Sequence, residues 1–149
     1  MKSLKEDVME RRNFIALSIA GVGASLISPA QALAKGKEKN MAGGVFYTKD
    51  NPGRWDKKIA GHLPNVEVER TKGKVTVQVV TAHAMDDYKH YIVKHVLLDA
   101  DYNFLDENMF DPMKDKAPIS TFELKNYKGK VYALSMCNKH DIWMSEASI

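Results

Sequence analysis

The sequence predicts an all-β domain, and three features of the chain support this fold class. Val75, Val77 and Val79 alternate with polar residues, which is the pattern of a strand that buries one face. Turn-forming residues recur about every eight to twelve positions between segments of this kind. After residue 34, no long window carries the apolar stripe of an amphipathic helix. Short strands at this spacing are typical of a β-sandwich or a β-barrel.

The first segment, residues 1–34, is predicted to be an export signal and not part of the fold. Its charged start carries the pair Arg11-Arg12, an uncharged stretch follows from Phe14 to Ile27, and small residues then mark a cleavage site after Ala34. The arginine pair resembles a twin-arginine signal, so the predicted location is periplasmic or otherwise exported. The alternative is a membrane anchor, but the apolar stretch from Phe14 to Ile27 is shorter than the ~18 residues that a spanning helix needs. We therefore expect no stable membrane insertion after cleavage.

The remaining chain divides into a short linker and one folded domain. Residues 35–44 are polar and glycine-rich, which indicates a flexible linker, and residues 45–149 have a length that suits a single domain. Alternation and β-branched residues predict the strands of this domain. They are Val66–Glu69, Lys74–Val80, Tyr91–Leu98, Ser120–Leu124 and Lys130–Met136, while Phe104–Phe110 is ambiguous.

Charge and cysteine content exclude several classes of function. The formal net charge is +3, and lysines are interleaved with acids instead of forming the basic block that follows a phosphate backbone. Nucleic-acid binding is therefore not expected. The only cysteine, Cys137, cannot form an internal disulfide, and iron–sulfur clusters and cysteine-rich zinc sites need more thiolates than this chain has.

The histidines and the cysteine suggest a metal site. His62, His83 and His140 fall where predicted loops meet strands, and His90 begins the next strand. In Cys137-x-x-His140, one turn can offer a thiolate and an imidazole to the same ion, and imidazole suits iron, copper, zinc and nickel. Backbone N–H groups after Cys137 could donate hydrogen bonds to its sulfur. His95 lies five residues after His90, so in a continuous strand it points to the opposite face, and we do not expect it to be a ligand.

These segments resemble the superoxide reductase family, which includes neelaredoxin and the iron-centre domain of desulfoferrodoxin. The resemblance extends from about Trp55 to the C-terminus and does not include the cysteine-rich, rubredoxin-like domain of the two-centre members. The matching segments are Gly61–Pro64, Thr81–Met85, Lys89–Ile92 and Leu134–His140, with Trp143.

The resemblance implies a fold, a cofactor and a reaction. The fold is an immunoglobulin-like, seven-stranded β-sandwich with the metal site on loops at one end. The cofactor is one iron ion per chain, Fe2+ or Fe3+, with an equatorial plane of His62, His83, His90 and His140, an axial Cys137 and an open sixth position. The reaction is the one-electron reduction of superoxide to hydrogen peroxide, an antioxidant activity that needs an external donor such as a rubredoxin-like protein or a cytochrome. Relatives are often tetramers or dimers, so a homo-oligomer is expected.

Two departures from the family pattern affect the site. Members commonly have Glu-Lys directly before the first histidine, whereas this chain has Ala60-Gly61, so both the glutamate that can occupy the open iron position and the lysine that attracts superoxide are missing. Lys57, Lys58 and Lys139 are candidates to take over the role of the lysine. His83 and His90 are seven residues apart where members commonly have six, and Ala84 stands in place of a proline.

Two other functions fit parts of the sequence. Cys137, His140 and Met144 form C-x-x-H-x-x-x-M, which is close to the loop that binds copper in exported blue-copper electron carriers. This interpretation leaves three histidines without a role. The second alternative is a domain without enzymatic activity that uses its metal to bind a partner or to deliver iron.

Overall fold

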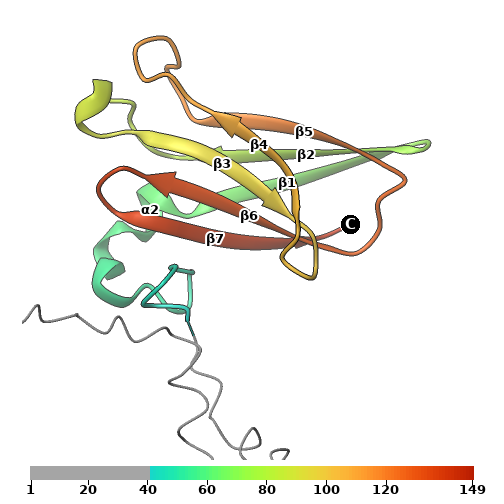
Figure 1. Ribbon diagram of the computed structural model, residues 1–149, viewed down its shortest axis with the longest axis horizontal. Coiled ribbons are helices and arrows are strands. Elements are labelled where there is room, and N and C mark those ends of the chain that lie inside the picture. Colours follow the sequence, from blue (N-terminus) through green and yellow to red (C-terminus); the bar gives the residue numbers. More distant parts are fainter. Residues whose placement is uncertain (1–40) are drawn as a thin grey trace, which may run out of the picture. The chain divides into compact units, whose positions relative to one another are not determined.

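The computed structural model describes residues 41–149, which form two antiparallel β-sheets packed face to face (Figure 1). The three-stranded sheet has the order β1-β2-β5, and the four-stranded sheet has the order β4-β3-β6-β7. The expected seven-stranded β-sandwich is confirmed. The strands are β1 (Pro64–Thr71), β2 (Lys74–Thr81), β3 (Ile92–Leu98), β4 (Phe104–Met109), β5 (Ile119–Lys125), β6 (Lys130–Cys137) and β7 (Asp141–Ser148).

Three short helical segments lie at one end of the sandwich. The 3-10 helix η1 (Gly53–Lys58) and the one-turn helix α2 (Ile59–His62) precede β1, and the 3-10 helix η2 (Asp87–Lys89) lies between β2 and β3. In Figure 1 these segments and the β6–β7 turn gather at the left, whereas the β1–β2 hairpin and the β5–β6 connection lie at the right. No helix among residues 41–149 is long and apolar enough to cross a membrane. The predicted export signal and most of the predicted linker lie outside the described residues.

The strand predictions hold with two differences. The ambiguous segment Phe104–Phe110 contains a strand, β4, and the sequence reasoning did not place β7 at all. Ile142, Trp143 and Met144 are three consecutive apolar residues in β7, so both faces of this strand carry apolar side chains and the alternation that marks a strand is hidden.

The core lies between the sheets and is built from the alternating positions that the sequence predicts. Val75, Val77 and Val79 of β2 are all buried, as are Phe122 of β5 and Leu97 of β3. Val77 faces Phe122 directly across the β2–β5 ladder. β2 and β5 bury every second side chain against the other sheet, so close packing fixes the relative positions of the two sheets and of the loops that extend from them.

Candidate metal centre

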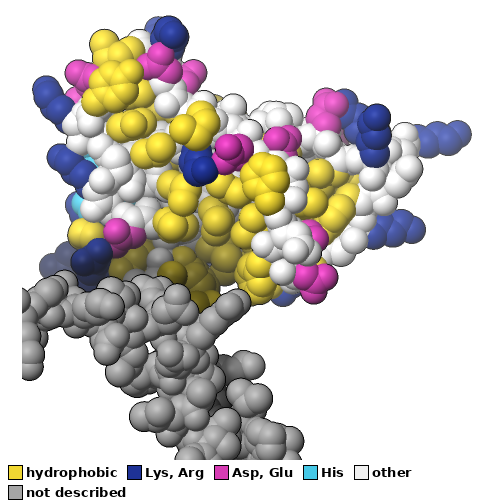
Figure 2. Space-filling view, viewed as in Figure 1, with side chains coloured by type: hydrophobic (Ala, Val, Ile, Leu, Met, Phe, Trp, Pro, Cys, Tyr) yellow, Lys and Arg dark blue, Asp and Glu magenta, His cyan; other side chains and the backbone are white. Residues whose placement is uncertain are grey.

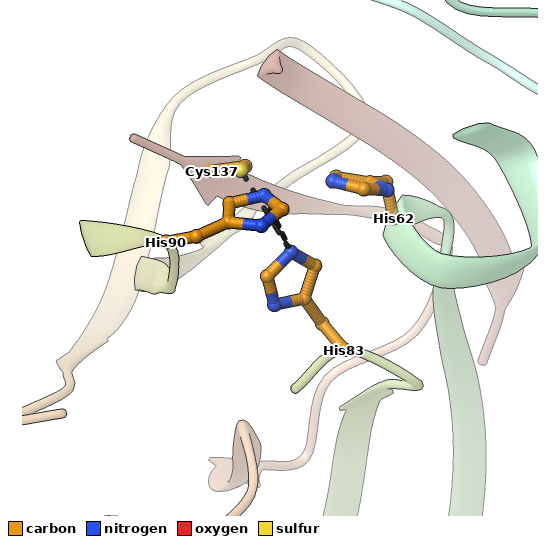
Figure 3. A group of neighbouring side chains, drawn as sticks. All are labelled: His62, His83, His90 and Cys137. Atoms are coloured by element: carbon orange, nitrogen blue, oxygen red, sulfur yellow. Dashed lines mark hydrogen bonds between the residues drawn. The ribbon is translucent and has the colours of Figure 1, made fainter. Parts of the chain in front are cut away.

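Five potential metal donors come together at the end of the sandwich that carries the helical segments. His62 is the last residue of α2, His83 follows β2 by two residues, and His90 lies between η2 and β3. Cys137 is the last residue of β6, and His140 lies in the turn to β7. Figure 3 shows His62, His83, His90 and Cys137 pointing toward one another from these separate segments, and their donor atoms all lie within 4.8 Å of one another.

His140 completes this group through its Nδ1 atom. That nitrogen lies 2.9 Å from Nε2 of His62 and 3.0 Å from Nε2 of His90. It also lies 3.6 Å from the sulfur of Cys137. All five residues that the sequence and the family resemblance single out therefore face one centre.

The four imidazole rings are arranged as a square. Neighbouring ring centroids are 4.6 Å apart for His62–His83 and His62–His140, 4.4 Å for His83–His90 and 4.7 Å for His90–His140. His62 and His90 lie across the square, with centroids 5.9 Å apart and planes inclined by 30°. The inward nitrogens are 2.9, 3.0 and 3.1 Å apart along three edges. A square with edges of about 3.0 Å has its corners about 2.1 Å from the centre, which matches the ~2.0–2.1 Å bond between an imidazole nitrogen and zinc, a divalent metal of the same row as iron.

The protons on these rings cannot satisfy the three nitrogen contacts. Nδ1 of His62 donates to the carbonyl oxygen of Lys58 at 3.0 Å, and Nδ1 of His83 donates to the carbonyl oxygen of Ala84. In neutral rings both Nε2 atoms are therefore bare acceptors. The contact with His62 requires a proton on Nδ1 of His140, and the contact between His83 and His90 requires a proton on Nε2 of His90. These two protons would then point at each other across the 3.0 Å contact between His90 and His140. A bound cation removes this conflict because it accepts all four lone pairs.

The charge state of the histidines suits metal binding. Burial lowers the pKa of His62 to about 4, and burial is also the main cause of the lowered pKa of His83, His90 and His140. The positive charge of Lys58 contributes to the lowered pKa of His83, His90 and His140. The rings are therefore neutral near pH 7, which is the state in which an imidazole binds a metal.

The thiol of Cys137 lies beside the square and not within it. Its sulfur is 3.9 Å from Nε2 of His83 and 3.6 Å from Nδ1 of His140, which is farther than the nitrogens are from one another. The backbone N–H of Lys139 donates to this sulfur at 3.4 Å. Of the backbone groups expected to reach the sulfur, Lys139 thus supplies the hydrogen bond, and such a bond withdraws charge from a thiolate ligand and changes the potential of its metal.

Sequence reasoning missed the residues that hold these donors in place. Asp141 adopts a positive φ of 62° and closes the turn after His140, where its carboxylate accepts a hydrogen bond from Trp55 Nε1 at 2.8 Å and pairs with Arg54. The ring of Trp55 in turn contacts that of His140 edge-on, with centroids 4.7 Å apart. These contacts connect η1 to the β6–β7 turn. They join residues that are far apart in the sequence, so no local sequence pattern predicts them.

Asn138 ties the cysteine turn to the loop that carries His90. Its side-chain oxygen accepts from the backbone N–H of Tyr91 at 3.0 Å, and its side-chain nitrogen donates to the carbonyl oxygens of Tyr88 and Lys89 at 3.1 and 3.3 Å. Its own backbone N–H donates to the carbonyl oxygen of Tyr91 at 3.2 Å. One residue next to Cys137 therefore fixes both flanks of His90.

The three candidate lysines differ in their relation to the site. The charge of Lys58 acts on three of the histidines, and that of Lys139 acts on His90 and His140. Lys57 is not among the main causes of any of these pKa shifts, although all three lysines are exposed. Figure 2 shows histidine side chains at the left edge of the molecule, next to lysine and arginine side chains.

Two residues considered in the sequence lie apart from the donors. His95 is fully buried between the sheets and does not belong to the donor group. The argument from the five-residue spacing of His90 and His95 assumed one continuous strand. It does not apply here, since β3 begins only at Ile92 and has a bulge between Ile92 and Lys94. Met144 lies in β7 opposite Leu134, three pairs along the same ladder from the Cys137–Asp141 pair. The blue-copper prediction is therefore not supported, since β7 carries Met144 away from Cys137.

Comparisons with known proteins agree with this geometry. Residues 54–146 match the family model described as desulfoferrodoxin. The structure is similar to that of a variant of the superoxide reductase (neelaredoxin) of Ignicoccus hospitalis, with 28% identity, 72% of this chain and 94% of that chain covered, and a TM-score of 0.63. It is also similar to a superoxide reductase in the oxidised state, with 31% identity, 59% of this chain and 87% of that chain covered, and a TM-score of 0.51. A reduced variant of the superoxide reductase (neelaredoxin) of Archaeoglobus fulgidus has 25% identity, with 63% of this chain and 92% of that chain covered and a TM-score of 0.53. No curated protein sequence matches the chain.

Proposed function

The chain belongs to the desulfoferrodoxin family, and on that premise we propose that it is an exported superoxide reductase with one iron ion per chain. The observation that carries the proposal is the square of four neutral imidazole nitrogens beside a thiol. An iron ion that alternates between Fe2+ and Fe3+ supplies one electron, and this electron and two protons convert superoxide to hydrogen peroxide. The residues of the chain hold the ion, set its potential and admit the anion.

The donor set favours iron over copper. Type 1 copper sites use two histidines, a cysteine and a weak axial methionine. Here four imidazoles converge, and the methionine that the copper interpretation requires, Met144, lies elsewhere on β7. The fifth donor raises the coordination number above the four ligands that structural zinc sites use, which argues against zinc as well.

The surroundings of the donors favour an anionic substrate. Among residues 41–149, the donor group contains no carboxylate, so no glutamate or aspartate competes with superoxide for an open coordination position. Four neutral imidazoles and one thiolate leave a divalent ion with a net positive charge. Lys58 and Lys139 add positive charge next to His90 and His140. Charges of this sign attract a small anion and raise its rate of association.

The remaining parts of the proposal concern partners and location. An external one-electron donor, either rubredoxin-like or a cytochrome, returns the iron to the ferrous state, and the protein forms a homo-oligomer, a tetramer or a dimer. Residues 1–34 direct the protein through the twin-arginine route to the periplasm. Support for export comes from Arg11-Arg12, the uncharged stretch after them and the small residues before Ala34.

Pulse radiolysis of the purified ferrous protein, combined with metal quantification, tests the activity. We expect one iron per chain, oxidation of the iron by a superoxide pulse, and one hydrogen peroxide per iron without oxygen release. Oxygen release would indicate dismutation instead of reduction. If the reduced protein is not rapidly oxidised by superoxide, the domain is a metal-dependent binding or delivery module and the enzymatic proposal is wrong.

A further inference from the structure

The interior of the sandwich changes character one layer below the metal centre. On four strands, a buried polar residue lies between the apolar core and the centre, although the buried residues farther from the centre on the same strands are apolar. On β3 the apolar Ile92 lies beyond this residue and packs against Cys137. Val79 gives way to Thr81 on β2, Leu97 to His95 on β3, Phe122 to Ser120 on β5 and Ala133 to Ser135 on β6. We call Thr81, His95, Ser120 and Ser135 the polar layer.

The side chains of the polar layer form one continuous hydrogen-bonded chain across both sheets. Nδ1 of His95 contacts Oγ of Ser120 at 2.8 Å, and Nε2 of His95 contacts Oγ1 of Thr81 at 2.9 Å. The Thr81 hydroxyl donates to Oγ of Ser135 at 2.9 Å. Since that hydroxyl gives its proton to Ser135, the His95 Nε2–H must donate to Thr81, and Nδ1 must accept from Ser120.

The polar layer is buried, and the imidazole ring of His95 in it is neutral. Thr81 and Ser120 are each 2% exposed, and His95 and Ser135 are 0% exposed. Burial lowers the pKa of His95 to about 4, so the ring is neutral near pH 7. A buried polar group that is fully hydrogen-bonded contributes little net stability compared with an apolar residue of the same shape. Apolar side chains fill the next layer of the same strands, so stability alone does not account for polar residues here.

The polar layer is joined directly to the segments that bear two of the proposed ligands. Thr81 ends β2, and its carbonyl oxygen accepts the backbone N–H of His83 at 2.8 Å. Ser135 lies two residues before Cys137 on β6 and pairs with His95 across the β3–β6 ladder. The hydrogen bond between Thr81 and Ser135 thus spans the gap between the two sheets, two residues before His83 on one side and two residues before Cys137 on the other. Ser120 differs, because β5 does not carry a proposed ligand.

We propose that Thr81, His95 and Ser135 are positioning residues that fix His83 relative to Cys137 for metal binding, with the Thr81 hydroxyl as the junction. This inference rests on the metal centre of the proposed function. A metal site requires its ligands to be held close to their final geometry, and loss of a group that orients a ligand typically costs about 10–100-fold in metal affinity.

A comparison of Thr81→Val with Ser120→Ala in the full chain tests the inference. Both substitutions remove one buried hydroxyl that bonds to His95, but only Thr81 is joined to a segment with a proposed ligand. The measurements are the Fe2+ affinity by chelator competition, the position of the thiolate-to-iron charge-transfer band, and the melting temperature of the metal-free protein. We expect Thr81→Val to weaken Fe2+ binding about tenfold and to shift the band, while Ser120→Ala changes affinity by less than about twofold.

A conservative variant and a second pair separate positioning from general stability. Thr81→Ser keeps the hydroxyl and should restore the affinity. Equal losses of affinity in Thr81→Val and Ser120→Ala, or a Thr81→Ser protein that binds Fe2+ as weakly as Thr81→Val, would overturn the inference.

If Thr81→Val does not fold, His95→Gln and His95→Asn replace it. A glutamine amide can reach the position of Nε2 and an asparagine amide that of Nδ1, so the glutamine variant should bind Fe2+ more tightly, and the reverse order overturns the inference.

The wild-type measurements distinguish this inference from the proposed function. A wild-type protein that binds iron but does not reduce superoxide contradicts the proposed activity alone, because the affinity comparison remains valid. A wild-type protein that binds iron while Thr81→Val and Ser120→Ala behave alike contradicts the inference alone. A wild-type protein that takes up no metal contradicts both.

Discussion

The two ends of the sandwich interior use the same strands for different purposes. Away from the metal centre, Val77, Leu97 and Phe122 form an apolar core, whose burial drives folding in proportion to the area removed from water. Next to the centre, hydroxyls and one imidazole occupy the corresponding inward positions. The difference suggests a division of roles, in which the apolar layer stabilises the fold and the polar layer, as proposed above, supports the geometry of the site. Substitutions in one layer should therefore leave the property carried by the other largely intact.

The largest effect is expected at the centre itself, from Cys137→Ser. A serine hydroxyl stays protonated near pH 7 and is a poor substitute for a thiolate, so the charge-transfer band and superoxide reduction should be abolished. The metal-free protein should lose only about 1 kcal/mol of stability, because serine is close to cysteine in size and most single substitutions cost about this much. Visible spectroscopy of the iron-loaded protein and thermal melting of the metal-free protein check the two halves of this prediction. A retained band means that Cys137 is not a ligand.

The substitution Phe122→Ala in the apolar core should have the opposite effect, with lower stability and an unchanged metal centre. Truncating a buried phenylalanine leaves a cavity and should cost about 3–5 kcal/mol of unfolding free energy. Below its melting temperature, the variant should keep the charge-transfer band of the wild type, because Phe122 belongs to the apolar cluster and not to the polar layer. Denaturant unfolding and visible spectra of the same samples measure both properties. A band that shifts as far as in Thr81→Val would show that the two layers are not independent.

Acid should affect the polar layer before it affects the apolar core. Burial lowers the pKa of His95 from its ordinary 6.5 to about 4. Between these values the unfolded chain takes up a proton that the folded protein excludes, so the contribution of His95 to stability is complete above pH 6.5 and is lost as the pH falls toward 4. The size of this loss is about 3 kcal/mol. The difference between wild-type and His95→Gln unfolding free energies, followed from pH 7 to pH 4 in the metal-free state, isolates it, and a difference that does not change with pH contradicts the prediction.

The smallest effect is expected on the surface beside the centre. Removing the charge of Lys58 by Lys58→Ala should slow the reaction with superoxide about threefold at low ionic strength, since that charge acts on three of the histidines. Added salt should reduce the difference from the wild type. Lys57→Ala is the matched control, because this exposed neighbour has the same charge but is not among the main causes of the histidine pKa shifts. Equal slowing in both variants would assign the effect to net charge and not to Lys58.

The amino-acid sequence is enough to predict the fold class and to single out the candidate donors. The alternation of Val75, Val77 and Val79 requires a strand with one buried face, and this local periodicity does not depend on the rest of the chain. In the same way, Cys137 and His140 occur at a spacing that lets one turn present both. The positions of His62, His83 and His90 near predicted strand ends indicate them as further donors, and the family resemblance implies the full ligand set. These features are local patterns or residue identities, so the sequence contains them directly.

Tertiary structure alone decided which atoms meet. The register of β6 with β7 separates Met144 from Cys137, and the contacts of His140 select Nδ1 as the atom that faces the other donors. The polar layer joins Thr81 and Ser135, which lie 54 positions apart in the chain. Such contacts depend on how strands pair and how sheets pack, because these determine the direction of each side chain, and no short window of sequence carries that information.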